Sequence, residues 1–278
     1  MRAAETRQHA REALQGKWGK AALTMLVYGL LTSIISGILN LIPIIGPIAN
    51  LVITIPLTFG FVATLIKLKR GEDTTYTEFF TTGFSNFASS WKVTLWTCVK
   101  LVIPIVLIIV SMIIMYIGFG AAAFSLQAAG VPLDGTATTI NVSNSTAASA
   151  GSSAIVGFIG IIGLIASSIW LTIKGYLFKP VFFILFDNPN KTAKEIVEES
   201  AKVMNGNRWK WFCLELSFIG WLILAVFTLG IGMLWIAPYM IISTIVFYEF
   251  LFGKKEETAE PVAEGPVQET IEEPKTEA

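Results

Sequence analysis

Six long hydrophobic stretches alternate with more polar segments along this chain. Each stretch is long enough to cross a hydrocarbon core of about 30 Å as a helix. They lie at roughly 21–42, 47–66, 93–117, 154–174, 211–229 and 233–252. The pattern therefore predicts an all-α polytopic membrane protein with six transmembrane helices.

The basic residues between these stretches fall on alternate segments. Three connections carry neither lysine nor arginine, namely 43–46, 118–153 and 230–232, whereas every other segment carries several. Basic side chains resist translocation, so the segments that carry them are expected on the cytoplasmic side. We therefore expect a multi-pass protein with both termini in the cytoplasm.

The segments on the basic side resemble one another. Thr75-Tyr76-Thr77-Glu78 and Thr192-Ala193-Lys194-Glu195 both have the spacing of a capping box, which marks a helix start. We expect three units, each an interfacial amphipathic helix followed by a transmembrane hairpin. The alternative is that inward-facing loops simply gain such helices and anchors without internal repetition. The expected interfacial anchors are Trp18, Lys20, Trp91, Lys92, Trp209 and Lys210.

Four parts are expected around or within the membrane domain at 21–252. Segments 1–20 and 187–206 are predicted to form cytoplasmic amphipathic helices. The connection 118–153 is rich in Ala, Ser, Thr and Gly, which predicts a flexible extracytoplasmic loop. Segment 253–278 is rich in Pro and Glu without apolar periodicity, so a disordered acidic cytoplasmic tail is expected.

Composition adds a charge asymmetry to this picture. The chain is 54% hydrophobic and 14% charged, which is typical of a polytopic membrane protein. Eight glutamates and one lysine follow Lys255, so the rest of the chain holds 19 basic and 12 acidic residues. This excess attracts anionic lipid headgroups on the cytoplasmic side, at roughly 1 kcal/mol per basic residue.

Two charged residues fall inside predicted spans. Lys100 lies in the third span and Glu215 in the fifth, and a charge near the middle of a bilayer costs about 2.5–3.5 kcal/mol on insertion scales. Counting from Trp91 and Trp209 puts them at similar depths, so they form a candidate intramembrane polar pair. Two alternatives stay open: separate contacts with Lys100 reaching the interface, and a transport or proton-relay site.

The fourth span carries a row of small residues. Gly157, Gly160, Gly163 and Ser167 recur at three- and four-residue spacing, which lets two helix backbones approach closely. Helix packing is the favoured interpretation, with a pore lining as the alternative.

Sequence motifs give no support to an enzyme. His9 is the only histidine, so neither a histidine metal site nor a histidine-based catalytic triad is predicted. No nucleophile elbow, phosphate-binding glycine loop or paired intramembrane carboxylate is found. We expect no enzymatic activity, no cofactor and no nucleic-acid partner.

The C-terminal half carries a recognisable pattern. It includes the run Glu198-Glu199-Ser200-Ala201-Lys202-Val203-Met204-Asn205-Gly206-Asn207-Arg208-Trp209-Lys210, followed by Leu214-Glu215-Leu216-Ser217-Phe218-Ile219-Gly220-Trp221. With Arg70-Gly71-Glu72 and Ala10-Arg11-Glu12-Ala13-Leu14, this resembles the integral membrane proteins of domain-of-unknown-function family 975. It is also distantly similar to the membrane portion of some glycerophosphodiester phosphodiesterases. The resemblance implies a bacterial plasma-membrane protein and supplies no catalytic residues.

Together these observations favour a non-enzymatic scaffold, regulator or envelope-stress component. It would act through its basic cytoplasmic face on anionic lipid, a protein partner or a second copy of itself. The alternative is a transporter or channel for a small or amphiphilic solute, with Lys100 and Glu215 in an internal site.

Overall fold

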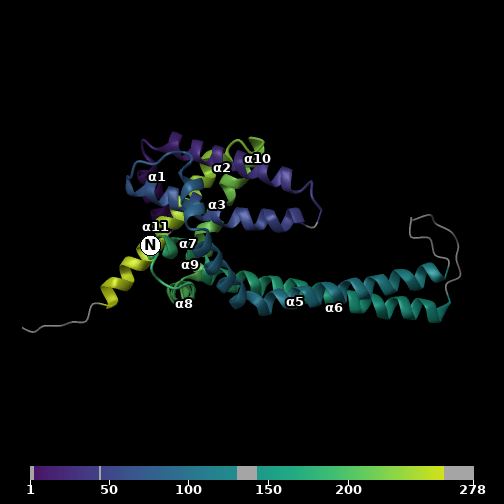
Figure 1. Ribbon diagram of the computed structural model, residues 1–278. Helices are drawn as coiled ribbons and strands as arrows, with labels where there is room; N and C mark the ends of the chain where they lie inside the picture. Colours follow the sequence, from purple (N-terminus) through teal and green to yellow (C-terminus); the bar gives the residue numbers. More distant parts are fainter. Residues whose placement is uncertain (1–2, 44, 130–142, 260–278) are drawn as a thin grey trace, which may run out of the picture.

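The computed structural model describes residues 3–43, 45–129 and 143–259, with side chains up to Gly253. These residues form helices and no strand (Figure 1). In chain order the elements are α1 (Ala3–Leu14), α2 (Trp18–Leu39), α3 (Ile45–Arg70), α4 (Glu78–Ser85), α5 (Phe87–Ala128), α6 (Asn144–Gly175), the 3-10 helix η1 (Tyr176–Phe178), α7 (Val181–Asp187), α8 (Ala193–Met204), α9 (Arg208–Leu216), α10 (Ile219–Phe227) and α11 (Met233–Ala259).

The predicted all-α class is confirmed, and so are the six spans. Six helical segments of the described chain are long and apolar enough to cross a membrane. The fourth continues through η1 and α7, and the fifth is divided into α9 and α10 at Ser217 and Phe218. The fourth hydrophobic stretch was predicted to end at 174, just before η1, whereas the break in the fifth was not predicted because hydrophobicity continues through it.

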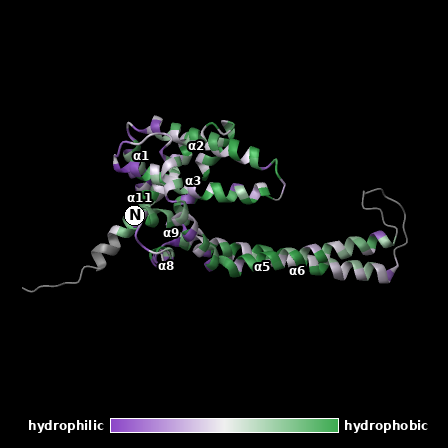
Figure 2. Ribbon diagram, viewed as in Figure 1, coloured by the Kyte–Doolittle hydropathy of each residue, from purple (hydrophilic) through white to green (hydrophobic). Residues whose placement is uncertain are grey.

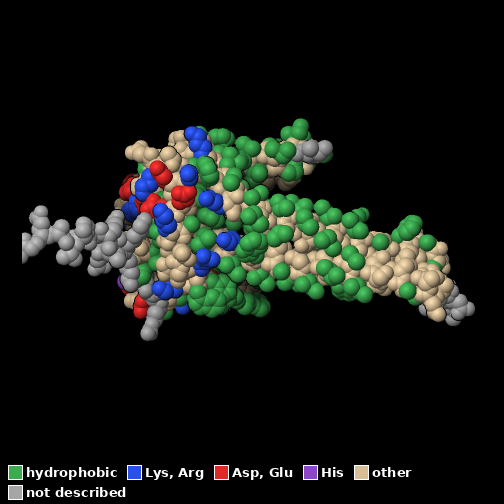
Figure 3. All heavy atoms as spheres, turned by 90° about the horizontal axis from the view of Figure 1, so that it is seen from below, with side chains coloured by type: hydrophobic (Ala, Val, Ile, Leu, Met, Phe, Trp, Pro, Cys, Tyr) green, Lys and Arg blue, Asp and Glu red, His purple; other side chains and the backbone are tan. Residues whose placement is uncertain are grey.

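Charged and apolar residues separate along the long axis of the molecule. Figure 2 shows hydrophilic residues at one end and hydrophobic helices extending away from it. Figure 3 shows lysine, arginine and acidic side chains gathered at that same end. We call this end the charged body; it comprises α1, α4, α7, α8, α9 and the adjoining ends of α2, α3 and α11. The α5–α6 pair extends from it as an apolar arm (Figure 1).

The core of the charged body is built from bulky side chains of several helices. Trp211, Phe79, Phe218 and Phe247 are among the largest fully buried side chains, and they come from α9, α4, the α9–α10 break and α11. On α8 the buried residues are Ile196, Val197, Ser200, Val203 and Met204. The body is therefore held by a shared apolar interior, and the α8 face that fills it recurs at helical spacing.

Helices α3 and α4 pack with their backbones in contact at two glycines. A Cβ on Gly60 would lie 1.9 Å from the Phe79 carbonyl oxygen, and one on Gly83 would lie 2.4 Å from the Pro56 carbonyl oxygen. No side chain larger than hydrogen fits at either position without moving a backbone. Although Gly83 weakens α4 as an isolated helix, it permits this close approach.

Proline 56 leaves one helical carbonyl of α3 without its usual donor. In a regular helix the amide of residue 56 would bond to the carbonyl of Val52, but proline has no N–H. The indole Nε1 of Trp91 donates to that carbonyl oxygen at 3.1 Å. Trp91, predicted as an interfacial anchor, therefore fastens the start of α5 to the proline site of α3.

The α5–α6 arm is much longer than predicted. Helix α5 has 42 residues and α6 has 32, so at about 1.5 Å per residue they extend roughly 63 and 48 Å. The expected loop 118–153 is wrong at both ends, since α5 continues to Ala128 and α6 begins at Asn144 with Ser143 as its N-cap. Alanine is the strongest helix former, which explains the extension of α5. The remainder, 130–142, lies outside the described residues.

Small residues of α6 lie directly against α5. A Cβ on Gly157 would come within 2.7 Å of the Phe119 ring, one on Gly160 within 2.4 Å of the Met115 amide nitrogen, and one on Gly163 within 2.7 Å of Ser111. Ser167 is buried, and its hydroxyl donates to the Gly163 carbonyl at 2.6 Å. These four residues thus occupy the helix–helix contact of the arm.

The two capping sequences behave differently. Thr192 and Glu195 form a full capping box at the start of α8. At the other sequence α4 begins after Thr77, and the Glu78 carboxylate accepts from the Thr75 amide at 3.3 Å without a reciprocal hydroxyl contact. The capping box at Thr75 and Glu78 is therefore only half formed, because α4 starts two residues later than the motif implies.

The end of the chain also departs from expectation. Helix α11 continues to Ala259, so the predicted tail at 253–278 begins as helix. Residues 260–278 lie outside the described residues.

The ends of α3 and α7 meet α11 of the charged body through ion pairs. Arg70 at the end of α3 contacts Asp187 at the end of α7 at 2.7 Å and Glu249 of α11 at 3.6 Å. Lys69 also pairs with Glu249, and the Tyr248 hydroxyl donates to Asp187 at 3.1 Å. These groups tie the C-terminal ends of α3 and α7 to the interior of α11.

Candidate functional site

One hollow of the molecule lies where α5 leaves the charged body. It is a pocket of about 700 Å³ between the first turns of α5, the end of α7 and the start of α8. Its lining residues are Ser89, Lys92, Val93, Leu95, Trp96, Leu185, Pro189, Lys191, Thr192, Ala193, Lys194 and Ile196. We call it the lysine pocket.

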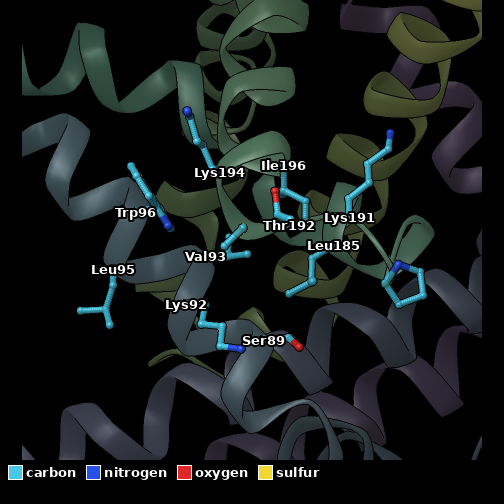
Figure 4. Close-up of a pocket in the computed structure, with 12 residues that line it drawn as sticks. Ser89, Lys92, Val93, Leu95, Trp96, Leu185, Lys191, Thr192, Lys194 and Ile196 are labelled. Atoms are coloured by element: carbon cyan, nitrogen blue, oxygen red, sulfur yellow. The ribbon is translucent and has the colours of Figure 1, made fainter.

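The lysine pocket has an apolar floor and a basic rim. Val93, Leu185 and Ile196 are buried and form the floor. Figure 4 shows these side chains in the middle of the site, with Lys92 and Lys194 on either side of them. An apolar floor beside ammonium groups suits a ligand that has both a negative charge and an aliphatic part.

The charge of the rim is only partly neutralised. Lys191 pairs with Glu199 at 2.7 Å, whereas Lys92 and Lys194 form no ion pair within the described part of the chain. No acidic residue lines the pocket. Two ammonium groups are therefore available to an anion.

Glu195, the first acidic residue of α8, is hydrogen-bonded to the backbone at the start of that helix. The Glu195 carboxylate accepts from the Thr192 amide at 2.9 Å, and this hydrogen bond lowers the pKa of Glu195 below its ordinary value. The capping box thus keeps this carboxylate ionised at the helix start. It orients the first turn of α8, which carries Lys194.

The predicted Lys100–Glu215 pair does not form. Lys100 Nζ lies 3.9 Å from Glu198 of α8, and Glu215 pairs instead with Lys179 at 2.8 Å. The prediction measured depth from Trp91, but α8 packs along the first turns of α5 and extends the charged region as far as Lys100. Lys100 therefore lies beside a charged helix.

The register of the arm supports this placement. Ser111, Met115 and Gly118 of α5 oppose Gly163, Gly160 and Gly157 of α6. Continuing the same register along the two antiparallel helices brings Lys100 level with Lys174. Lys100 of α5 and Lys174 of α6 therefore lie at the same position along the axis of the arm.

Glu215 is fully engaged by three donors. Its Oε2 accepts from the Tyr176 hydroxyl at 2.7 Å, and its Oε1 accepts from Lys179 at 2.8 Å and from Trp211 Nε1 at 3.1 Å. Tyr176 begins η1, where α6 ends, and Glu215 lies next to the end of α9. The cluster therefore joins the interruptions of two candidate spans.

The six predicted anchors have different environments. Trp18 packs against Tyr239 with ring centroids 5.9 Å apart, and Lys20 pairs with Asp73 at 2.6 Å. Lys210 donates to Asn207 at 3.2 Å. Trp209 is 71% exposed. Trp18 and Trp91, in contrast, are partly buried and bound to other helices.

Sequence reasoning identified Lys92 but missed the rest of the lysine pocket. Lys191 enters the sequence analysis only through the general basic excess, Lys194 only as part of a capping sequence, and Trp96 only as part of the span 93–117. The signal that could have linked them is the capping box, since it fixes where α8 starts and which lysines lie on its first turn.

Comparison with known proteins gives one match. The family model described as "Protein of unknown function (DUF975)" matches residues 1–255. No curated protein and no solved structure matches the chain, so the expected likeness to glycerophosphodiester phosphodiesterases finds no support. Since the family model covers nearly the whole sequence, this six-span helical chain belongs to the DUF975 family of proteins of unknown function.

Proposed function

We propose that this protein is a non-enzymatic component of a bacterial plasma membrane that binds anionic lipid headgroups through its basic cytoplasmic face. Both termini and the charged body would lie in the cytoplasm, with the lysine pocket at the membrane surface. In this role it would serve as a scaffold, regulator or envelope-stress component.

One observation carries the proposal. Lys92 and Lys194 flank an apolar floor and have no acidic partner within the described residues. A phosphate can take one of these ammonium groups while the adjoining glycerol and first methylenes cover the exposed side chains of Leu95 and Trp96, which also line the pocket. A soluble acidic partner would use the charges but not this apolar surface, which is why a lipid is favoured.

The test is lipid-dependent stability of the purified protein. In neutral detergent, short-chain phosphatidylglycerol is expected to raise the midpoint of thermal unfolding more than the matching phosphatidylcholine. Bound lipid at one hundred times its dissociation constant stabilises a protein by about 2.7 kcal/mol. At roughly 1 kcal/mol per lysine, Lys92→Gln with Lys194→Gln should weaken phosphatidylglycerol binding about 30-fold.

A matched control separates the pocket from general charge. Lys174→Gln with Lys210→Gln removes two positive charges that do not line the pocket. These changes should leave the phosphatidylglycerol effect in place. An equal loss in both double variants would show that only net charge matters and would refute the site.

A transporter or channel is the second candidate, and the Glu215 cluster favours it. Interrupted helices often build the sites of transporters, and here Tyr176 and Glu215 join two interruptions. The site would now use Lys179 in place of Lys100. A single cysteine at position 215, in a variant lacking Cys98 and Cys213, should react with impermeant reagents from both sides of the membrane if this protein transports. Labelling from neither side would contradict transport.

A further inference from the structure

A second hollow lies between α6 and α9, apart from the lysine pocket. It is a groove of about 620 Å³ lined by Ser168, Ile169, Thr172, Ile173, Tyr176, Arg208, Trp209 and Phe212. None of these residues lines the lysine pocket. One wall is a stripe along α6, and the other is the first turn and a half of α9.

The walls of this groove are apolar and face outward. Ile169, Ile173 and Trp209 are all exposed large hydrophobic side chains. Aromatic contacts hold the α9 wall in place, since the Phe212 ring lies 5.2 Å from that of Trp209 and 6.1 Å from that of Tyr176. Because this part of α6 belongs to a candidate membrane span, the groove opens toward lipid hydrocarbon.

One cation stands in this apolar setting. Arg208 forms no ion pair within the described residues, and one of its amino groups donates to Asn205 at 3.3 Å. A guanidinium carries five N–H donors and matches a phosphate in a two-bond geometry. Most of the donors of Arg208 are therefore free for a phosphate at the groove.

We propose that the groove between α6 and α9 binds one acyl chain of an anionic phospholipid, whose phosphate contacts Arg208. The apolar walls match the chain, and the unpaired guanidinium matches the headgroup. The inference does not depend on the lysine pocket, because it rests on different residues. A second copy of this protein or a hydrophobic peptide would also cover the walls, but neither explains the unpaired arginine.

The test uses the full chain reconstituted in vesicles of phosphatidylcholine and phosphatidylglycerol. A trace of phosphatidylglycerol with a photoactivatable group on one acyl chain is added, and the crosslinked peptides are identified by mass spectrometry. The expected crosslinks fall in 168–176 and 208–212. A matching phosphatidylcholine probe serves as the reference for headgroup selectivity.

Two variants and two controls decide the outcome. Thr172→Trp fills the groove from an exposed position and should lower crosslinking there at least fivefold, whereas Ile162→Trp, at an exposed position two turns before the groove residue Ile169, should not. Arg208→Gln should lower crosslinking of the anionic probe at least fivefold and leave the phosphatidylcholine probe unchanged. Lys174→Gln removes a nearby charge outside the groove and should change neither.

Three results would overturn the proposal. Crosslinking that survives Thr172→Trp would place the lipid elsewhere. Equal labelling by both probes, unchanged by Arg208→Gln, would mean that the headgroup is not recognised. Crosslinks between two protein copies through 168–176, in place of lipid adducts, would identify a different occupant. All variants keep Lys92 and Lys194, so failure here leaves the lysine pocket to its own test.

Discussion

Replacing Trp91 by phenylalanine should expose how the protein satisfies the carbonyl freed by Pro56. The change keeps an aromatic ring but removes the indole N–H that donates to Val52 at 3.1 Å. A carbonyl left unsatisfied in a buried setting costs about 1–3 kcal/mol. We expect Trp91→Phe to lower the free energy of unfolding by about 2 kcal/mol, part of which is lost packing.

A double-mutant cycle isolates the hydrogen bond from the packing. Pro56→Ala restores an amide that can donate to Val52 within α3. In that background Trp91→Phe should cost only the packing part, so the two changes should couple by about 1–2 kcal/mol. The assay is reversible unfolding in mixed micelles with increasing sodium dodecyl sulfate, followed by circular dichroism.

An exposed tryptophan provides the control for this cycle. Trp209→Phe, at a side chain that is 71% exposed, should change the free energy of unfolding by less than about 0.5 kcal/mol. Independent sites add within about 0.3–0.5 kcal/mol. A coupling between Trp91→Phe and Pro56→Ala below that limit would refute the proposed role of the indole.

Two further predictions use the same unfolding assay. Gly83→Ala places a Cβ 2.4 Å from the Pro56 carbonyl oxygen and should destabilise the protein by about 1–3 kcal/mol. The control is Gly29→Ala, whose added Cβ would have no neighbouring atom within 4 Å. It should leave the stability unchanged or raise it by up to about 1 kcal/mol. If Gly83→Ala left the free energy of unfolding unchanged, this would contradict the close approach of α3 and α4. The lowered pKa of Glu195 means that its cap stabilises the fold above its ordinary pKa of 4.5 and is lost as pH falls through the lower folded value. Glu195→Gln should therefore flatten the stability profile in that acidic range, and an unchanged profile would show that the cap does not contribute.

The spans were predictable because hydrophobic length is a local property of the sequence. The break in the fifth span was not, since Ser217 and Phe218 interrupt a run that stays apolar on both sides. The helical ends of the arm were missed for a different reason. Residues 121–123 are three consecutive alanines, which favour helix in isolation, but the small polar residues nearby outweighed them in the prediction of a loop.

The partners of Lys100 and Glu215 could not be predicted from their spacing in the sequence. Glu215 binds Lys179 because α6 ends at Gly175 and the chain turns through η1 beside α9. Gly175 and Pro180 flank that turn, but they do not indicate which helix the chain will meet there. The depth of Lys100 was predicted by counting residues from Trp91 as if Trp91 lay at the membrane surface. Trp91 instead binds α3, so it does not mark that surface.

The last lysines of the arm offer a better reference level. Beyond Lys100, α5 carries no charged residue up to Ala128, and α6 carries none from Asn144 up to Lys174. At about 1.5 Å per residue each uncharged stretch extends roughly 42–45 Å, which exceeds a hydrocarbon core of about 30 Å. If the two lysines mark one surface, the outer turns of the arm, with their alanines, serines and glycines, reach past the opposite surface. This placement puts the lysine pocket, the Glu215 cluster and the Arg208 groove together at the surface where the charged body meets the bilayer, which is where phospholipid phosphates lie.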